Sequence, residues 1–263
     1  MKQVIAVTGS AHSGKSAVAL AVAASLAAKK KDVIVLSGDR VTPMLKVYAP
    51  LADTPQSLSI GGLLMGGDLT DKAVSERIVL HPKCNHLGYA AFATGDNIST
   101  YPPRFDAERV ATLFALYYRL CDYLVVDCTC NLMVDSIAVH GLTSADVTLR
   151  LTTPDMAGLE FWRAQLPLLR DERFSRARAV PVLNLAKPIS PVGEVLKMHK
   201  PLLGDIRYIL PYAYEVEDRM MAGRLIKFLG RKEGIQFENM LEGLIQREIL
   251  RPNKPDEKEK QKA

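Results

Sequence analysis

Short apolar runs recur along the chain, and most of them end at a glycine, a proline or a polar residue. Buried β-strands are therefore predicted at residues 3–8, 32–36, 87–93, 123–126, 146–151, 179–183 and 206–210. Continuous apolar runs of this kind are typical of parallel strands that helices cover on both faces. The pattern predicts an α/β fold of the doubly wound type, with a mostly parallel sheet and helices on both faces.

Longer segments with apolar positions three and four residues apart separate these runs. Val110, Leu113 and Tyr117 follow this spacing and predict a helix over 106–120. Further helices are predicted from residue 17 to about 30 and at 58–65, 72–80, 155–169, 217–228 and 237–250. We expect one domain over residues 1–250. Residues 251–263 carry Pro, Lys and Glu with almost nothing apolar, so a disordered charged tail is expected there.

The composition agrees with one aliphatic core. The chain has 263 residues, of which 48% are hydrophobic and only 6% aromatic, which suits helix-covered strands better than a β-sandwich. The chain has four cysteines, Cys84, Cys121, Cys128 and Cys130. Their spacing is not that of a disulfide framework, so we expect reduced thiols and a cytoplasmic protein. His81, Cys84 and His86 are close enough in sequence to bind a metal, but no second ligand pair follows, which favours loop residues.

The positive charge permits, without requiring, an anionic partner. The formal net charge is +5, and basic residues gather near the expected C-terminal helices, namely Arg219, Arg224, Lys227, Arg231 and Lys232. This cluster is either a non-sequence-specific DNA surface or a solvated helix face.

An apolar stripe on the expected last helix has two interpretations as well. Phe237, Met240, Leu241, Leu244 and Ile245 recur at helical spacing, which fits a membrane-targeting helix or packing onto the core. Neighbouring glutamates make an anionic membrane less attractive, so we favour packing and consider membrane binding the weaker alternative.

The clearest chemistry lies between the first predicted strand and the first predicted helix. The pattern G-x-x-x-x-G-K-[ST] is matched there by Gly9, Ser10, Ala11, His12, Ser13, Gly14, Lys15 and Ser16. Glycines let several backbone N–H groups face one phosphate, and the positive N-terminus of the following helix, with Ala17, faces the same anion. Lys15 would reach the β- and γ-phosphates, and the Ser16 hydroxyl would join the Mg²⁺ shell. The motif predicts a P-loop that binds a purine nucleoside triphosphate with Mg²⁺.

Two aspartates at strand ends are expected to complete this site. Asp127 follows Leu124 to Val126 and would hold Mg²⁺ directly or through water. Asp39 ends the strand that follows the first helix and would position the attacking water or contact Mg²⁺ through water. The alternative for Asp39 is a turn or helix-cap residue. The predicted metal residues are thus Ser16, Asp39 and Asp127, and the predicted catalytic residues are Lys15, Asp39 and Asp127.

The order of these pieces resembles the ParA/MinD family of P-loop ATPases over about residues 1–245. The segments that carry the resemblance, besides the P-loop and the two aspartates, are 59–67, Leu149 to Asp155, Pro181 to Asn184 and Ile209 to Tyr212. The resemblance implies that Asn184 contacts adenine and that Pro211 lies in a loop beside the base. It also implies that Asp39 positions water, that Asp127 binds Mg²⁺, and that the second switch runs from Cys128 to Asn131.

One position departs from that family's pattern. The family usually carries a signature lysine one residue after the first P-loop glycine, where this chain has Ser10, and its adjacent glycines are Ala11 and His12 here. In the family that lysine reaches the partner's phosphates across a nucleotide-sandwich dimer. The chain resembles an atypical branch that includes CpaE/TadZ-like pilus-localisation proteins and ParA-like proteins of mobile elements.

The resemblance implies an ATPase that converts ATP and water to ADP and phosphate and dimerises with ATP. Its partner would be non-specific DNA or a component of a pilus or secretion apparatus. Two alternatives stay open at this point. One is a P-loop small-molecule kinase that uses Ser37 to Arg40 to bind its substrate, and the other is a nucleotide-binding scaffold with little hydrolysis.

Overall fold

A computed structural model describes residues 2–66, 68–102 and 104–250. The expected tail at 251–263 lies outside the described residues. The strands are β1 (Gln3–Gly9), β2 (Val33–Ser37), β3 (Val79–His81), β4 (Cys84–Ala90), β5 (Tyr123–Asp127), β6 (Val147–Thr152), β7 (Arg178–Ala186) and β8 (Tyr208–Pro211). They form one eight-stranded sheet in the order β3-β4-β2-β5-β1-β6-β7-β8, in which only the β3–β4 pair is antiparallel. This confirms the mostly parallel sheet that the apolar runs predicted.

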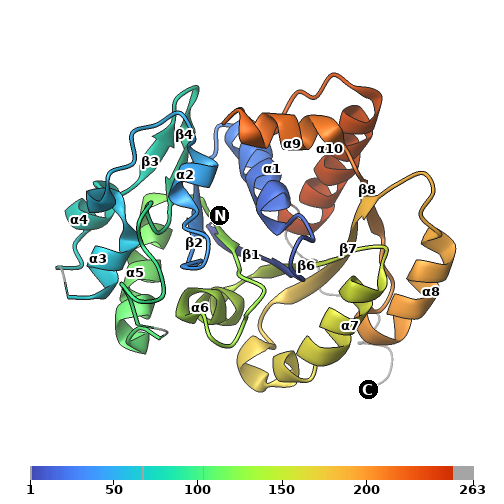
Figure 1. Ribbon diagram of the computed structural model, residues 1–263, viewed down its shortest axis with the longest axis horizontal. Helices are drawn as coiled ribbons and strands as arrows, with labels where there is room; N and C mark the ends of the chain where they lie inside the picture. The colour runs from blue at the N-terminus through green and yellow to red at the C-terminus, as the bar shows by residue number, and fades with distance from the viewer. Residues whose placement is uncertain (1, 67, 103, 251–263) are drawn as a thin grey trace, which may run out of the picture.

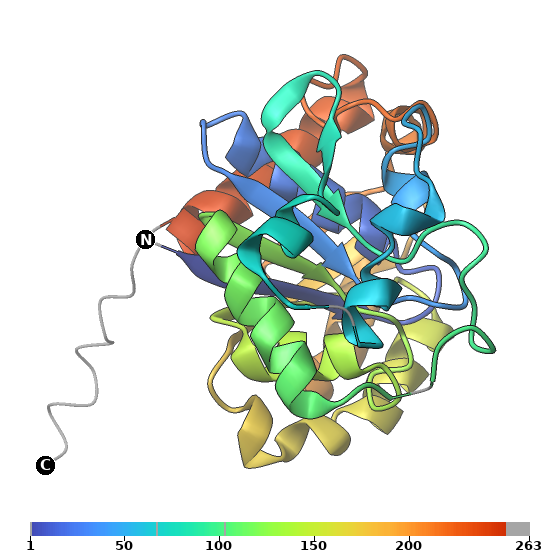
Figure 2. The same cartoon turned by 90° about the vertical axis from the view of Figure 1, so that its left-hand side faces the viewer.

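Helices cover both faces of this sheet (Figures 1 and 2). One face carries α1 (Lys15–Ala27), α2 (Leu45–Tyr48), α9 (Tyr214–Met221) and α10 (Lys232–Leu244). The other face carries α3 (Ile60–Leu64), α4 (Asp71–Ser75), α5 (Ala107–Leu120), α6 (Ser136–Ser144) and α7 (Met156–Gln165), with α8 (Val192–Leu203) packed on α7. Short 3₁₀ turns lie at Gln56–Leu58, Leu168–Arg170 and Glu172–Phe174, and a π-helical segment, Ile245–Leu250, continues α10. The fold is the doubly wound α/β fold expected from the sequence.

Alternate side chains of the central strand reach different cores. Ile5 and Val7 of β1 pack against the α1 layer, whereas Val4 and Ala6 pack against the α5 to α7 layer. Successive side chains of a strand point to opposite faces, so a strand buried on both faces needs apolar residues throughout. This is the physical reason for the continuous apolar run at the start of the chain.

The register brings the ends of three strands to one edge of the sheet. Asp127, the last residue of β5, lies beside Val7 of β1 and Ser37 of β2. The loops that follow β1, β2 and β5 therefore emerge together. In an open α/β sheet, this carboxyl edge is where ligands bind.

The helix predicted at 72–80 is only partly correct. α4 ends at Ser75, and Val79 pairs with Tyr89 in an antiparallel edge strand. The short apolar segment at 78–80 is compatible with either a turn of helix or a strand. Backbone hydrogen bonds to the neighbouring β4 stabilise the strand.

The predicted helix at 217–228 is displaced. α9 starts earlier, at Tyr214, and ends at Met221, shortly before Gly223 adopts a φ of 59°. A left-handed glycine at this position stops a helix, which apolar spacing alone does not reveal. The sequence also gave no indication of α2, α6 and α8.

The apolar stripe of the last helix packs onto the core. Phe237, Leu241, Leu244 and Ile245 are buried, while Met240 is exposed. α10 lies against β8, so the stripe is not available as a membrane-targeting face. None of the helices in the described part of the chain has both the length and the apolar character needed to cross a bilayer.

Three of the five cations in the basic cluster pair with carboxylates, while Arg224 and Lys232 are exposed. The ion pairs are Arg219–Glu215 at 3.1 Å, Lys227–Glu238 at 2.8 Å and Arg231–Asp218 at 3.4 Å. Lys227 belongs to the loop that precedes α10, is itself buried, and also donates a hydrogen bond of 3.3 Å to Glu242 on that helix. These three cations serve contacts within the chain, so they give little support to a DNA surface at this place.

Candidate functional site

The loop between β1 and α1 has the backbone of an anion cradle. Gly14 adopts a φ of 77°, a left-handed conformation that favours glycine, and a Cβ there would lie 2.5 Å from Asn184 Nδ2. A Cβ on Gly9 would lie 2.6 Å from the Leu151 carbonyl oxygen. The first turn of α1 contains no acidic residue, so its free N–H groups and positive dipole end are not neutralised. The loop thus fits a phosphate group, as its sequence predicted.

Two residues of the P-loop stand where the resembling family has other residue types. His12 is exposed and adopts a φ of 57°, a conformation that is uncommon for a residue with a side chain. Ser10 is buried, and its carbonyl oxygen accepts hydrogen bonds from Ser13 Oγ at 2.8 Å and from Lys15 Nζ at 2.7 Å. These bonds tie the loop together and bring the Lys15 ammonium over it.

Asp127 is buried at the mouth of the loop. Its side chain is only 4% exposed, and its Oδ2 accepts a hydrogen bond of 2.6 Å from the hydroxyl of Tyr48. Burial raises the pKa of the Asp127 carboxyl above its usual value, and the Ser16 hydroxyl, the Tyr48 hydroxyl and the Lys15 ammonium partly offset this rise. The carboxyl thus lies next to both P-loop side chains that were predicted to act with it. Tyr48 was not predicted.

Asp39 caps a turn immediately after β2. Its Oδ1 accepts hydrogen bonds of 2.9 Å from the backbone N–H groups of Val41 and Thr42. Its charge also helps to raise the pKa of Asp127, although it is the smallest of the influences on that carboxyl. The turn-capping alternative for Asp39 therefore has a direct structural basis in these hydrogen bonds, and the electrostatic influence on Asp127 keeps the alternative of a role at the metal site open.

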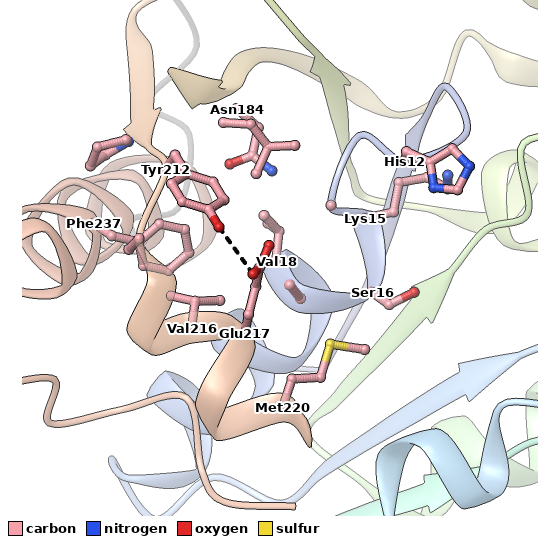
Figure 3. A pocket seen from close by; sticks show the side chains of 15 residues that line it. His12, Lys15, Ser16, Val18, Asn184, Tyr212, Val216, Glu217, Met220 and Phe237 are labelled. Atoms are coloured by element: carbon pink, nitrogen blue, oxygen red, sulfur yellow. Dashed lines mark hydrogen bonds between the residues drawn. The ribbon is translucent and has the colours of Figure 1, made fainter. Parts of the chain in front are cut away.

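A cavity of about 420 Å³ runs from the P-loop toward the C-terminal helices. The predicted site residues that line it are His12, Gly14, Lys15, Ser16, Ala17, Asn184 and Pro211. Lys15 and Ser16 lie toward one end, and Tyr212 and Phe237 lie toward the other (Figure 3). The volume falls within the range of sites that bind small molecules and cofactors. The structure therefore brings the P-loop and the expected base-contacting residues to one cavity, and Asp39 and Asp127 are not among its lining residues.

The amide of Asn184 has a fixed orientation. Asn184 is 2% exposed, and its Nδ2 donates a hydrogen bond of 2.8 Å to the Ser13 carbonyl oxygen. A carbonyl can only accept, so the amide cannot turn over without losing this bond. Its Oδ1 is buried and has no hydrogen-bond partner in the described part of the chain. Asn184 is a residue that lines the cavity, and a buried acceptor without a partner in such a residue is suited to a donor on a molecule that binds there.

The far end of the cavity contains residues that sequence reasoning missed. Val216, Glu217 and Met220 come from α9, and Phe237 comes from α10. The Tyr212 hydroxyl donates a hydrogen bond of 3.0 Å to Glu217 Oε2 along this wall (Figure 3). The sequence predicted a helix at 217–228 but not that this helix lines a cavity. Neither the spacing nor the composition of a helix distinguishes one that lines a cavity from one that packs on the surface.

The residues present fit a magnesium ion beside a triphosphate. Hydroxyl and carboxylate oxygens are the ligands that Mg²⁺ prefers, and Ser16, Asp127 and Asp39 would supply them. The buried carboxyl of Asp127 next to the Ser16 hydroxyl is the observation that supports this fit. When bound, Mg²⁺ would neutralise charge on the phosphate oxygens.

Other groups of metal-binding residue types do not form a site. No cluster of three or more His, Cys, Asp and Glu side chains able to hold a metal occurs among residues 2–66, 68–102 and 104–250. His86 pairs instead with Asp32 at 2.8 Å. All four cysteines are free thiols. Burial raises the pKa of Cys128 well above its usual value, which makes this thiol unreactive, whereas Cys130 is exposed.

Comparison with solved structures relates the whole fold to one group of ATPases. The septum site-determining protein MinD from Pyrococcus horikoshii, complexed with Mg-ADP, has a TM-score of 0.69 and 15% identity, over 93% of this chain and 96% of that one. McdA from Cyanothece has a TM-score of 0.72 and 14% identity, over 94% and 99%. A ParA family ATPase from Chlorobium tepidum has a TM-score of 0.69 and 19% identity, over 92% and 96%. The chain has the P-loop NTPase fold of these proteins, which confirms the predicted resemblance at the level of the fold.

Sequence comparison reaches less far. Residues 1–52 match the family model of adenylylsulphate kinase, which covers the P-loop and the β1-α1-β2 unit. No match was found among curated proteins.

Proposed function

We propose that this chain is an ATP-dependent switch of the ParA/MinD type that binds ATP with Mg²⁺ in the cavity at the P-loop. The observation that carries the proposal is the convergence of the P-loop, Asp127 and Asn184 within a fold that matches MinD and ParA-family structures over more than nine-tenths of the chain. The triphosphate would lie on the loop amides with Lys15, and the base would lie toward Tyr212 and Phe237.

Adenine suits the base end of the cavity better than guanine. Asn184 Oδ1 is held as an acceptor, because the Ser13 carbonyl fixes the other end of the amide. Adenine presents an exocyclic amine as a donor on its six-membered ring, where guanine presents a carbonyl oxygen. A guanine in the same position would leave two acceptors facing each other.

Replacing Asn184 by alanine should therefore reduce base selectivity. We expect Asn184→Ala to lower the ratio of ATP to GTP affinity by about 10-fold to 100-fold, the cost of about 1–3 kcal/mol for one buried unpaired polar group. The measurement is competition between ATP and GTP for a fluorescent ATP analogue. Asn239→Ala, which removes an exposed amide from α10, is the matched control. A preference for ATP that is equal in wild type and Asn184→Ala would remove Asn184 from base recognition.

Hydrolysis, nucleotide-dependent dimerisation and a positioned cargo belong to the same proposal. ATP would order the loops that follow Asp39 and Asp127, and release of phosphate would relax them. The buried Ser10 at the position of the signature lysine leaves no cation there to cross to a partner. Single-turnover hydrolysis by purified protein, with mass measurement in ATP and in ADP, separates an ATPase switch from a nucleotide-binding scaffold.

A P-loop kinase is the second candidate, because the first 52 residues match the adenylylsulphate kinase model. The match ends shortly after α2, whereas the ParA family ATPase from Chlorobium tepidum matches over 92% of the chain. A kinase requires a phosphorylated acceptor, so a screen for transfer of the γ-phosphate to small molecules distinguishes the two. We place the switch in the cytoplasm, in keeping with its four free cysteines.

The partner is a further part of this proposal. DNA or a pilus or secretion component would bind the nucleotide-controlled form, and the buried apolar stripe of α10 makes a membrane the weaker choice. Co-sedimentation with DNA and with liposomes, each with and without ATP, tests these surfaces, and failure of both would indicate a protein partner.

A further inference from the structure

A buried tyrosine contacts the carboxyl that is expected to act on the metal. The hydroxyl of Tyr48 donates a hydrogen bond of 2.6 Å to Asp127 Oδ2, and both side chains are almost completely buried, at 2% and 4% exposed. Tyr48 belongs to α2, far from Asp127 in sequence, and neither apolar spacing nor the P-loop motif indicates the contact. A short hydrogen bond to a carboxylate in a dry environment is among the stronger contacts a side chain can make.

This bond assigns different surroundings to the two carboxyl oxygens. Oδ2 accepts the Tyr48 hydroxyl, and the carboxyl group also interacts with the Ser16 hydroxyl of the P-loop. A carboxyl on the last residue of a strand would otherwise rotate about its terminal bond, because such torsions are broad. The tyrosine therefore selects one rotation of the group that must present an oxygen to a metal ion.

The tyrosine is itself held in place from two directions. Its ring lies 5.6 Å, centroid to centroid, from the ring of Tyr89 on β4. The first residue of its helix, Leu45, donates a backbone hydrogen bond of 3.2 Å to the Phe92 carbonyl oxygen just after β4. These two contacts fix the position of the Tyr48 hydroxyl next to Asp127. A group that orients a metal ligand must itself be held in a fixed position.

The same helix directly continues the loop that starts at Asp39. The turn capped by Asp39 leads within a few residues into α2, so Tyr48 and Asp39 lie on one short segment. A change in the position of this segment would move the hydroxyl relative to Asp127. The contact therefore joins the loop after β2 to the end of β5.

We propose that Tyr48 is a positioning residue for the magnesium site: its hydroxyl holds the Asp127 carboxyl in the orientation that the metal requires and links that carboxyl to the Asp39 loop. The inference rests on the proposed function, because it assumes that Asp127 acts on Mg²⁺ beside ATP. It assigns no chemical step to Tyr48. It predicts that the hydroxyl matters for the metal far more than for the nucleotide.

The test removes one oxygen atom. Tyr48→Phe keeps the buried ring and deletes the hydroxyl, and Tyr89→Phe makes the same deletion on the adjacent buried ring, which belongs to β4. Calorimetry measures two affinities for each protein: that for ATP in the presence of EDTA, and that for Mg²⁺ added to the ATP complex. Outer contacts to metal ligands are typically worth 10-fold to 100-fold in metal affinity, so we expect Tyr48→Phe to need about tenfold more Mg²⁺.

Each outcome decides the inference. The positioning role is supported if Tyr48→Phe binds Mg²⁺ more weakly than Tyr89→Phe does. The two variants must also have equal affinities for ATP in EDTA and equal melting temperatures. Equal Mg²⁺ affinities in the two variants would overturn the positioning role and leave the proposed function intact. A parallel loss of ATP affinity in EDTA would also overturn it, because general damage to the fold would then explain the result. If wild type itself binds no ATP with Mg²⁺, the proposed function fails, and the role of Tyr48 fails with it.

Discussion

Lys15→Ala is expected to abolish measurable ATP binding. The Lys15 ammonium lies over the P-loop, with its Nζ 2.7 Å from the Ser10 carbonyl oxygen, and Lys15 is the one lysine or arginine in the P-loop sequence. Two charge-assisted hydrogen bonds to phosphate oxygens are worth about 3 kcal/mol or more together, so their loss weakens binding by at least about 100-fold. The backbone amides of the loop remain, but they lose the charge that balances the phosphates.

The measurement is equilibrium binding of ATP with Mg²⁺ to wild type, to Lys15→Ala and to a surface control. Lys72→Ala removes an equally charged lysine that is highly exposed on α4 and pairs with Glu76. It should bind as wild type does. Matching melting temperatures would show that all three proteins are folded. Tight ATP binding by a folded Lys15→Ala protein would contradict the assignment of the P-loop.

Asp39→Ala is expected to bind ATP and to hydrolyse it about 100-fold more slowly, the usual contribution of a carboxylate that orients or deprotonates a water. The complication is its structural role, since its Oδ1 also caps the turn through Val41 and Thr42. Alanine removes both functions at once. The alanine variant alone therefore cannot distinguish a catalytic group from a turn residue.

Asp39→Asn separates the two roles of this side chain. Asparagine keeps an oxygen that accepts the two turn hydrogen bonds but carries no negative charge. If the charge acts on water, Asp39→Asn should hydrolyse ATP as slowly as Asp39→Ala in single-turnover assays. Turnover restored to the wild-type rate in Asp39→Asn would show that Asp39 serves only the turn.

Sequence reasoning reached the fold and one half of the site for a clear physical reason. The strands are buried on both faces, so their apolar runs are continuous and end where the backbone turns toward solvent. The P-loop is a local motif whose backbone, side chains and helix N-terminus all come from one stretch of chain. Gly14 illustrates this, because its conformation and its close contact with Asn184 both require the glycine that the motif specifies.

The residues of the candidate site outside the P-loop could not all be predicted from the sequence, because tertiary contacts bring them together. Tyr48 lies in a very short helix that no sequence pattern marks. Its hydroxyl reaches Asp127 through packing against β4 and β5. Glu217 lies on an amphipathic helix whose cavity-facing side has no distinctive spacing. The edge strand at Val79 was missed for a related reason, since its partner strand decides its conformation.

The basic cluster shows the opposite error. Arg219 and Lys227 stand out in the sequence as positive charges near the last helices, and charge counts treat each as available to a partner. In the fold, both are paired with glutamates from α9 and α10. Counting cations therefore overstated the positive surface, because the carboxylates that neutralise them are close in space.

The central claim is that the chain binds adenine nucleotide with magnesium at the P-loop, and titration calorimetry of the purified protein tests it most directly. ATP is added once with Mg²⁺ and once with EDTA. The account predicts saturable heat at one site per chain that becomes markedly tighter when Mg²⁺ is present, because Ser16 and Asp127 then contribute to binding. The absence of any magnesium-dependent heat from a folded sample would contradict it.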